Sequence, residues 1–257
     1  MAEFTESDDL RGATFRDVNL RDARFNAVDL SGAVLRGVVV ADVEVDSPWL
    51  FDGDHFLRVN GVDVLPLVDA ELNRRFPGRE QRAAGTPEGL RAAWDALQRT
   101  WAATVERAAA MPAGTVDESV GGEWSFAQTL RHLVMATDVW LGRAIQRTEQ
   151  PYHPAGLPDT GTDSGSAAYE DSSVFSATAP SYAEVLEARA SRVAMVGDFL
   201  ATVTPEVLAE QRSNPHDPQY DETVLSCLHT ILDEEWEHHR YAVRDLDALA
   251  GGQPSAS

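Results

Sequence analysis

Apolar residues recur every five positions near the N-terminus, over residues 8–47. The central apolar positions are Leu10, Phe15, Leu20, Phe25, Leu30, Leu35, Val40 and Val45. Two residues before each of the last seven stands an Ala or a Val. Neither an α-helix nor a flat β-strand has a five-residue period, so the pattern predicts a repeat architecture rather than an ordinary amphipathic element.

The following segment, residues 48–84, predicts a connector with a hairpin and a short helix. Two apolar runs at residues 56–59 and 62–65 flank Asn60-Gly61, a dipeptide typical of tight hairpin turns. A short helix is expected over residues 67–76. The connector contains no residue pattern that indicates chemistry, and we expect it to pack against the domain that follows.

Four amphipathic segments between residues 85 and 250 predict long helices. Their start signals are Thr86 with Pro87, Ser125 with Gln128, Ser181 with Glu184, and Asp221. The second helix is expected to run to about residue 145. A long polar stretch, residues 149–179, separates the second helix from the third, and structureless loops of that length are often functional or mobile. Together these elements predict a four-helix bundle.

The last helix carries two polar residues in the middle of its apolar seam. The seam positions are Leu225, Leu228, Leu232, Glu235, His239, Ala242, Leu246 and Leu249. Burying an unpaired carboxylate costs several kcal/mol, so another group must neutralise Glu235. Glu and His at i, i+4 point the same way from a helix and can chelate a divalent metal.

His132 lies among apolar neighbours in the second helix and is a candidate for a third ligand; the alternative is a hydrogen-bonded core histidine. Two histidines and one carboxylate suit zinc, nickel, iron or manganese. Three protein ligands would leave positions open for water or substrate.

A second register is also consistent with the sequence. Glu234 and His238 are likewise i, i+4, but their stripe is less apolar, so we prefer Glu235 and His239. His229 could support the site or act as a base, and is otherwise a capped or exposed histidine.

Asp138 and Arg240 could orient ligands or lie on solvated faces. His55, His153 and His216, in the connector and in loops, are expected to have no role.

Composition excludes several classes of function. The chain has 257 residues, a formal net charge of −21, and arginine as its only basic residue besides histidine. This charge argues against nucleic acid and anionic membranes as partners. Without a signal-peptide pattern or an apolar stretch near 20 residues, we expect a cytoplasmic protein. The single cysteine, Cys227, excludes an intrachain disulfide, and we expect it to be a packed thiol.

The N-terminal period resembles the pentapeptide-repeat family, as in VNLRD at residues 18–22 and VDLSG at residues 28–32. The resemblance implies a right-handed four-sided β-helix of about two coils, with a buried column of Leu and Phe. Two coils are few and solenoid ends need capping, so we expect a docking or dimerisation module. Arginines interleaved with the acids argue against an acidic surface that mimics DNA.

Two further motifs, EWSFAQTLRHL at residues 123–133 and LDEEWEHHR at residues 232–240, resemble the DinB-like metal-binding bundles. That family includes thiol-dependent S-transferases and mycothiol-dependent maleylpyruvate isomerases. In it, one histidine comes from the second helix and an i, i+4 pair from the last. Carried over to this chain, the metal ligands are His132, Glu235 and His239. Glu at the first position of the pair is the arrangement of the mycothiol-dependent isomerase branch.

The sequence therefore predicts a mainly α fold, a DinB-like four-helix bundle over residues 85–250 behind a short pentapeptide-repeat β-helix over residues 1–47. Residues 251–257 are expected to be a disordered tail. The function implied by the resemblance is thiol-dependent S-transfer or isomerisation, with zinc or another divalent metal, a thiol such as mycothiol and a small-molecule substrate. The alternative is a non-catalytic module, metal-binding or protein-interacting, that docks through the repeat. A homodimer is compatible with either.

Overall fold

The computed structural model describes residues 4–5, 8–26, 28–48, 50–51, 53–158, 172–176 and 178–251. The chain divides into two compact units, residues 1–44 and residues 45–257, and each is described by itself. Most of the tail expected at residues 251–257, and the middle of the long connection at residues 149–179, lie outside the described residues.

The N-terminal unit closes a turn every ten residues. The backbone N–H groups of Ala13, Ala23 and Ala33 donate to the carbonyl oxygens of Leu10, Leu20 and Leu30 at 2.9, 3.1 and 2.9 Å. The third residue of each turn has a positive φ: Gly12 at 73°, Asp22 at 63° and Gly32 at 73°. A type II turn requires this conformation at that position, so Gly and Asp fit the corners of the repeat.

The expectation of a buried Leu and Phe column in this unit is wrong. Leu10 is 44% exposed, Phe15 is 57% exposed and Leu35 is 66% exposed. No strand pairing occurs among the described residues of this unit. A stacked column buries a side chain between coils above and below it, and two coils give each side chain a neighbour on one side only.

The connector forms the expected hairpin and helix. Strand β1 (Arg58–Val59) pairs antiparallel with β2 (Val62–Asp63). Asn60 and Gly61 between them have φ of 50° and 83°, as a type I′ turn requires. Helix α1 (Leu65–Arg75) follows, and then a 3₁₀-helix η1 (Arg79–Ala83) leads into the bundle.

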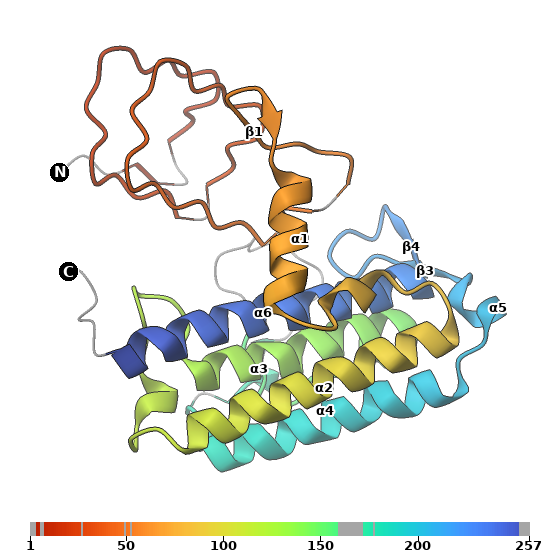
Figure 1. The fold of residues 1–257 in the computed structure, drawn as a ribbon. Helices are drawn as coiled ribbons and strands as arrows, with labels where there is room; N and C mark the ends of the chain where they lie inside the picture. The colour runs from red at the N-terminus through yellow and green to blue at the C-terminus, as the bar shows by residue number, and fades with distance from the viewer. Residues whose placement is uncertain are drawn as a thin grey trace. The chain divides into compact units, whose positions relative to one another are not determined.

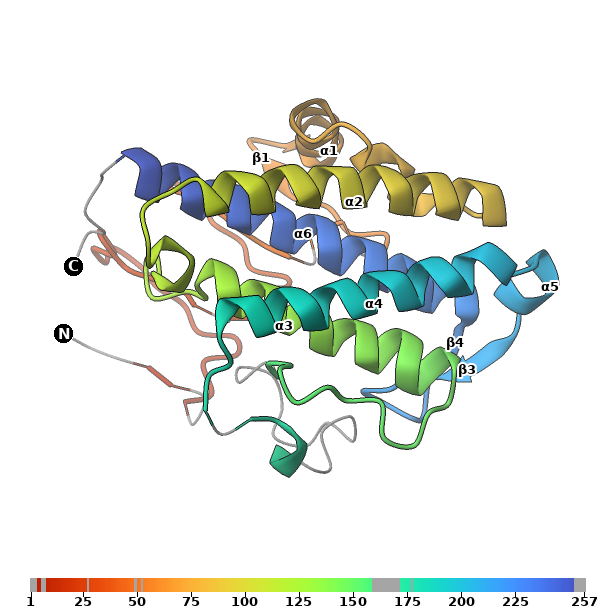
Figure 2. The same ribbon diagram turned by 90° about the horizontal axis from the view of Figure 1, so that it is seen from below.

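The long helices α2 (Pro87–Ala109), α3 (Phe126–Thr137), α4 (Tyr182–Thr202) and α6 (Val224–Gly251) form the predicted four-helix bundle (Figures 1 and 2). Helices α2 and α3 each contact both α4 and α6. A π-helix, η3 (Asp138–Ile145), continues α3 to the predicted end near residue 145. No helix in the described part of the chain has the length and apolar character needed to cross a membrane.

Short elements complete the bundle unit. They are η2 (Thr115–Asp117), η5 (Ser172–Val174), α5 (Pro205–Leu208), and strands β3 (Gln211–Ser213) and β4 (Asp221–Thr223), which pair antiparallel.

The predicted caps of the first three long helices are confirmed. The side chain of Thr86 accepts from the N–H of Gly89, and capping boxes join Ser125 with Gln128 and Ser181 with Glu184. The fourth cap, Asp221, is wrong, because pairing with β3 keeps residues 221–223 extended. Helix α6 begins at Val224, and the side chain of Thr223 accepts from the N–H of Ser226 at 3.0 Å.

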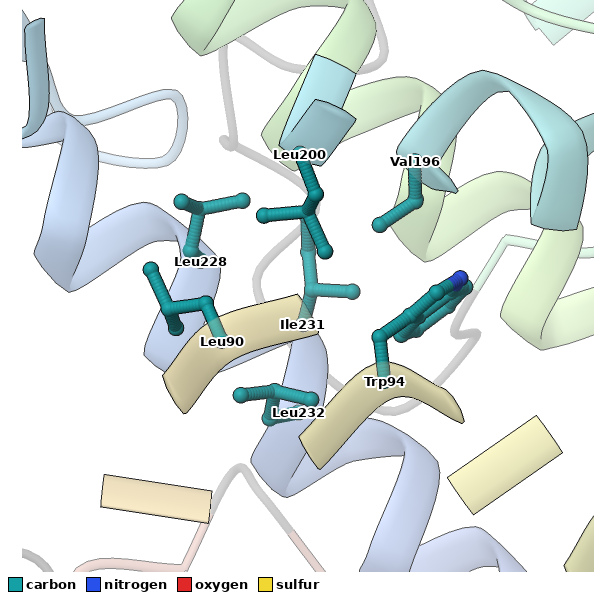
Figure 3. A pocket seen from close by; sticks show the side chains of 7 residues that line it. All are labelled: Leu90, Trp94, Val196, Leu200, Leu228, Ile231 and Leu232. Atoms are coloured by element: carbon teal, nitrogen blue, oxygen red, sulfur yellow. The ribbon is translucent and has the colours of Figure 1, made fainter. Parts of the chain in front are cut away.

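A small cavity at one end of the bundle is lined entirely by apolar side chains (Figure 3). They are Leu90 and Trp94 of α2, Val196 and Leu200 of α4, and Leu228, Ile231 and Leu232 of α6. The cavity between them is about 10 Å³. A space of that size holds at most one water molecule, and an apolar lining leaves even that water without partners. This end of the core therefore contributes stability rather than a binding site.

Candidate metal centre

Three potential metal ligands converge between α3 and α6. They are His132 on α3 and Glu234 and His238 on α6, and their ligand atoms all lie within 4.8 Å of one another. Glu234 Oε2 is 3.4 Å from His132 Nε2 and 3.3 Å from His238 Nδ1. The three side chains are 9%, 14% and 14% exposed, so the cluster lies at the rim of the bundle with limited access to solvent.

A backbone hydrogen bond fixes the protonation of His238. Its Nδ1 lies 2.8 Å from the carbonyl oxygen of Glu234, one helical turn earlier. A carbonyl can only accept, so Nδ1 carries the proton and Nε2 carries the lone pair. A hydrogen bond from the nitrogen that does not bind the metal commonly orients a metal-binding histidine.

Trp124 covers the two histidines. Its ring centroid lies 4.6 Å from that of His132 and 6.1 Å from that of His238, and the histidine rings are themselves 4.6 Å apart. Trp124 immediately precedes Ser125, the cap of α3, so the start of this helix positions the indole. An aromatic cover excludes water from one side of the cluster and strengthens electrostatic interactions within it.

The carboxyl of Glu234 is held in its charged form. Burial opposes its ionisation, but the hydrogen bond with His132 and the charge of His238 outweigh burial and lower its pKa below the usual value. An ionised carboxylate is the form that binds a metal cation.

The geometry fits a divalent metal. Two ligand atoms that are each about 2.1 Å from one zinc ion lie about 3.4 Å apart in a tetrahedron. The 3.4 Å between Glu234 Oε2 and His132 Nε2 matches that value. On His238 the nitrogen near Glu234 Oε2 is the protonated Nδ1, so Nε2 is the nitrogen left to bind a metal. Nδ1 of His132 is also buried and has no hydrogen-bond partner among the described residues. Nδ1 of His239 is unpartnered in the same way, so this property does not distinguish the two registers.

The structure does not bring Glu235 and His239 to His132. Both oxygens of Glu235 instead lie 2.5 Å from Nη2 of Arg189 on α4. Glu235 is 1% exposed and Arg189 is 6% exposed. Burial raises the pKa of Glu235, and the Arg189 guanidinium opposes that rise. The neutralising group required by a carboxylate in the seam is thus an arginine rather than a metal.

His239 has a protein partner at one ring nitrogen, and its Nδ1 is buried without a hydrogen-bond partner among the described residues. Its Nε2 lies 2.8 Å from Oγ1 of Thr104 on α2. That hydroxyl donates to the carbonyl of Thr100, so it accepts the Nε2 proton of His239. The ring meets Trp101 edge-on at 5.0 Å, and burial lowers its pKa to about 4. His239 is a neutral core histidine in this arrangement.

The difference between the two pairs follows from helix geometry. Successive residues of an α-helix are about 100° apart around its axis. Six of the eight predicted seam residues are buried, namely Leu228, Leu232, Glu235, His239, Ala242 and Leu246, and Leu225 and Leu249 at the two ends are half-buried. A residue in the middle of that seam faces α2 and α4. Glu234 and His238, one position earlier, face the flank of the bundle, where His132 lies.

A family model described as the DinB superfamily matches residues 66–242. This chain belongs to the DinB superfamily. A second model, for pentapeptide repeats, matches residues 9–39 in eight copies, which confirms the N-terminal resemblance. No curated protein and no solved structure matches the chain.

The other histidines of this DinB-superfamily protein have local roles. His229 Nε2 lies 2.9 Å from the carbonyl oxygen of Ala84, as expected of a capped histidine. Nδ1 of His153 accepts from the N–H of Ala155 at 3.1 Å. The ring of His216 packs at a tilt against that of Trp140, with centroids 5.4 Å apart, and its charge contributes to lowering the pKa of Glu234. The expectation that His216 has no role therefore overlooked its position near the cluster.

Asp138 and Arg240 do not contact the three candidate ligands through any described hydrogen bond. Asp138 is buried, pairs with Arg192 at 2.7 Å and accepts from the N–H of His153. Arg240 pairs with Glu237 and Asp46. Cys227 is the expected packed thiol: it is fully buried, and burial raises its pKa to about 12, which removes it from consideration as a nucleophile.

Sequence reasoning missed the groups that decide the register. Arg189 lies between Val185 and Val196 in the buried face of α4, so a basic residue inside an apolar stripe was the available signal. Thr104 is likewise a polar residue in the buried face of its helix, between Trp101 and Ala108 of α2. Trp124 is part of the motif that carries the family resemblance, but nothing in its sequence position indicates contact with both histidine rings.

Proposed function

We propose that this protein binds a divalent metal through His132, Glu234 and His238 and uses it in a thiol-dependent S-transfer or isomerisation. The observation that carries the proposal is the convergence of two imidazoles and one ionised carboxylate within 4.8 Å at a partly exposed rim. Membership of the DinB superfamily supports it. Three protein ligands leave coordination positions for water, thiol or substrate.

Each protein group has a defined part in this proposal. Glu234 supplies negative charge, and its backbone carbonyl accepts from Nδ1 of His238, which leaves the lone pair for binding on Nε2. Trp124 covers one side of the cluster and restricts water. When bound, the metal would supply Lewis acidity, which lowers the pKa of a coordinated thiol so that it is a thiolate at neutral pH.

The proposal also covers the identity of the metal, the thiol and the second substrate. Zinc is the first choice for two imidazoles and a carboxylate, with nickel, iron and manganese as alternatives. The thiol would be a low-molecular-weight one such as mycothiol, and the second substrate a small electrophile. A cytoplasmic location, where such thiols are kept reduced, is consistent with the single buried cysteine.

Elemental analysis of tag-free protein tests the metal site. We expect close to one zinc per chain in the wild type and loss of that zinc in His132→Ala. His229→Ala is a matched control, because it removes a histidine of α6 that is hydrogen-bonded to Ala84 instead. The zinc-loaded wild type should then convert a small electrophile only when a low-molecular-weight thiol is present, whereas His132→Ala should not. No zinc, nickel, iron or manganese in the wild type after reconstitution would overturn the proposal.

A second candidate function is protein docking through the pentapeptide segment. Its central apolar side chains, among them Phe15 at 57% and Phe25 at 60% exposure, are available to a partner. Light scattering on the full chain distinguishes a stable homodimer from a monomer. A metal-free protein that self-associates, and whose Phe15→Asp/Phe25→Asp variant is monomeric, would favour docking over catalysis.

A further inference from the structure

Two arginines of α6 share one carboxylate from a distant part of the chain. Asp46 lies 194 residues before Arg240 and 198 before Arg244. Its Oδ1 is 2.6 Å from Nη2 of Arg240, and its Oδ2 is 3.1 Å from Nη1 of both arginines. A paired contact of this kind, with two oxygens facing two guanidinium nitrogens, is the geometry by which arginine recognises carboxylates.

The other acids hold the arginines from a different side. Glu237 accepts from Nε and Nη2 of Arg240 at 3.0 and 2.9 Å. Asp245 accepts from Nε and Nη2 of Arg244 at 2.7 and 3.2 Å, and Glu123 also pairs with its Nη2. These contacts fix the Nε edges and leave Nη1 of both arginines directed to the same oxygen of Asp46. The helix thus orients the two guanidinium groups before any ligand arrives.

This arginine pair lies beside the candidate metal centre. The ring of Tyr241 meets the ring of His238 edge-on at 5.8 Å. The Cζ atoms of Arg240 and Arg244 lie over the same tyrosine ring, 4.4 and 5.2 Å from its centroid. One aromatic ring therefore separates the arginines from a metal-ligand candidate.

We propose that Arg240 and Arg244 form a carboxylate subsite of the metal centre, which Asp46 occupies until a carboxylate of the thiol or the electrophilic substrate replaces it. The inference deepens the proposed function, on which it rests, by naming a carboxylate-bearing substrate class. Exchange of one carboxylate for another preserves the charge balance of the cluster, in which Glu237, Glu123 and Asp245 also take part. An uncharged ligand would leave both Nη1 groups without a charged partner.

Asp46 is suited to exchange. Its side chain is 28% exposed, and those of Arg240 and Arg244 are 19% and 33% exposed. Ion pairs with this access to solvent contribute little net stability, so their replacement by a ligand carries a small cost. The buried pair of Arg189 with Glu235, at 6% and 1% exposure, is the contrasting case of a permanent contact.

Calorimetric titration of the full chain with fumarate, and with uncharged fumaramide, tests the subsite. Asp46→Asn should bind fumarate about tenfold more tightly than the wild type, because the competing carboxylate is gone. Adding Arg244→Gln to Asp46→Asn should abolish that gain, and fumaramide should show none. Asp247→Asn is the matched control: it removes a carboxylate from Arg107, 2.6 Å away, without releasing a second arginine, and should bind as the wild type does.

Each titration is run on zinc-loaded and zinc-free protein with zinc content measured, so that a failed metal site and a failed subsite give different results. A gain that depends on Arg244 in both forms supports the subsite even where zinc binding fails. Equal affinity in Asp46→Asn and wild type would overturn it. Fumarate binding that requires zinc and does not depend on Arg244 would also overturn it. Unfolding of Asp46→Asn would overturn it as well, because Asp46 would then be needed for the fold.

Discussion

Two Glu–His pairs lie one residue apart on α6 and have opposite environments. In the core, Glu235 forms an ion pair with Arg189, and His239 forms a hydrogen bond with Thr104. Glu234 and His238 meet His132 at the rim, under Trp124. Residue type and spacing are identical in the two pairs.

What separates them is what the neighbouring helices present. A buried carboxylate facing an arginine is already neutralised, whereas one facing two imidazoles forms a set of ligands. A Glu–His pair at i, i+4 therefore identifies a metal centre only when the facing helices are known. Each of the following variants removes an interaction on one face of α6 and leaves the other faces unchanged.

The largest effect is expected from Arg189→Met. This change leaves Glu235 buried without its partner, which should reduce the free energy of unfolding by about 3–5 kcal/mol in urea denaturation. Removing the carboxylate too, in Arg189→Met/Glu235→Leu, should recover most of the loss. A single variant within about 1 kcal/mol of the wild type would show that the pair does not neutralise the core face.

A smaller loss is expected from Thr104→Val. The Nε2 proton of His239 would lose its acceptor in the core, at a cost of about 1–3 kcal/mol in the free energy of unfolding. Zinc content should not change. Thr100→Val is the control on the same helix: its half-buried hydroxyl donates only to the carbonyl of Ala96, so the change should stay within about 0.5 kcal/mol. Equal losses in the two variants would contradict the role of Thr104.

The smallest effect concerns a third face of α6, where the connector packs. Arg79 and Arg82 both pair with Asp69, at 2.7 and 2.9 Å. Burial opposes ionisation of Asp69, but the hydrogen bond from Arg79 and the charge of Arg82 outweigh it and lower its pKa. A carboxyl with a lowered folded-state pKa stabilises above its unfolded pKa, near 4, and loses that contribution as pH falls through the folded value.

Wild type should therefore exceed Asp69→Asn in unfolding free energy by up to about 1 kcal/mol at pH 6. The difference should shrink as the pH falls below the unfolded pKa and through the lowered folded-state pKa of Asp69. The measurement is chemical denaturation of both proteins across pH. A difference that grows on acidification would contradict the sign of this linkage.

The local signals of the sequence predicted most of the bundle. Thr86, Ser125 and Ser181 cap helices as expected, and Asn60-Gly61 forms its turn, because each signal acts within a few residues. Asp221 failed because its strand partner, β3, outweighs a capping preference. Likewise, the exposure of the repeat depends on how many coils stack rather than on the period itself.

The candidate site was predicted in part. His132 and the choice between two registers came from the sequence, and the apolar seam of α6 was correct. The preference for Glu235 and His239 assumed that a polar residue in the seam needs a metal. Arg189 and Thr104, which remove that need, come from other helices, and their contacts with α6 are tertiary and not periodic.

The most direct test of this account is the zinc content of His238→Ala and His239→Ala, purified and reconstituted side by side. His238→Ala should lose its zinc and remain close to the wild type in metal-free stability. His239→Ala should keep its zinc and lose about 2–4 kcal/mol of unfolding free energy, because its ring packs in the core. Zinc lost from His239→Ala but retained by His238→Ala would contradict the central claim and return the site to the core face of α6.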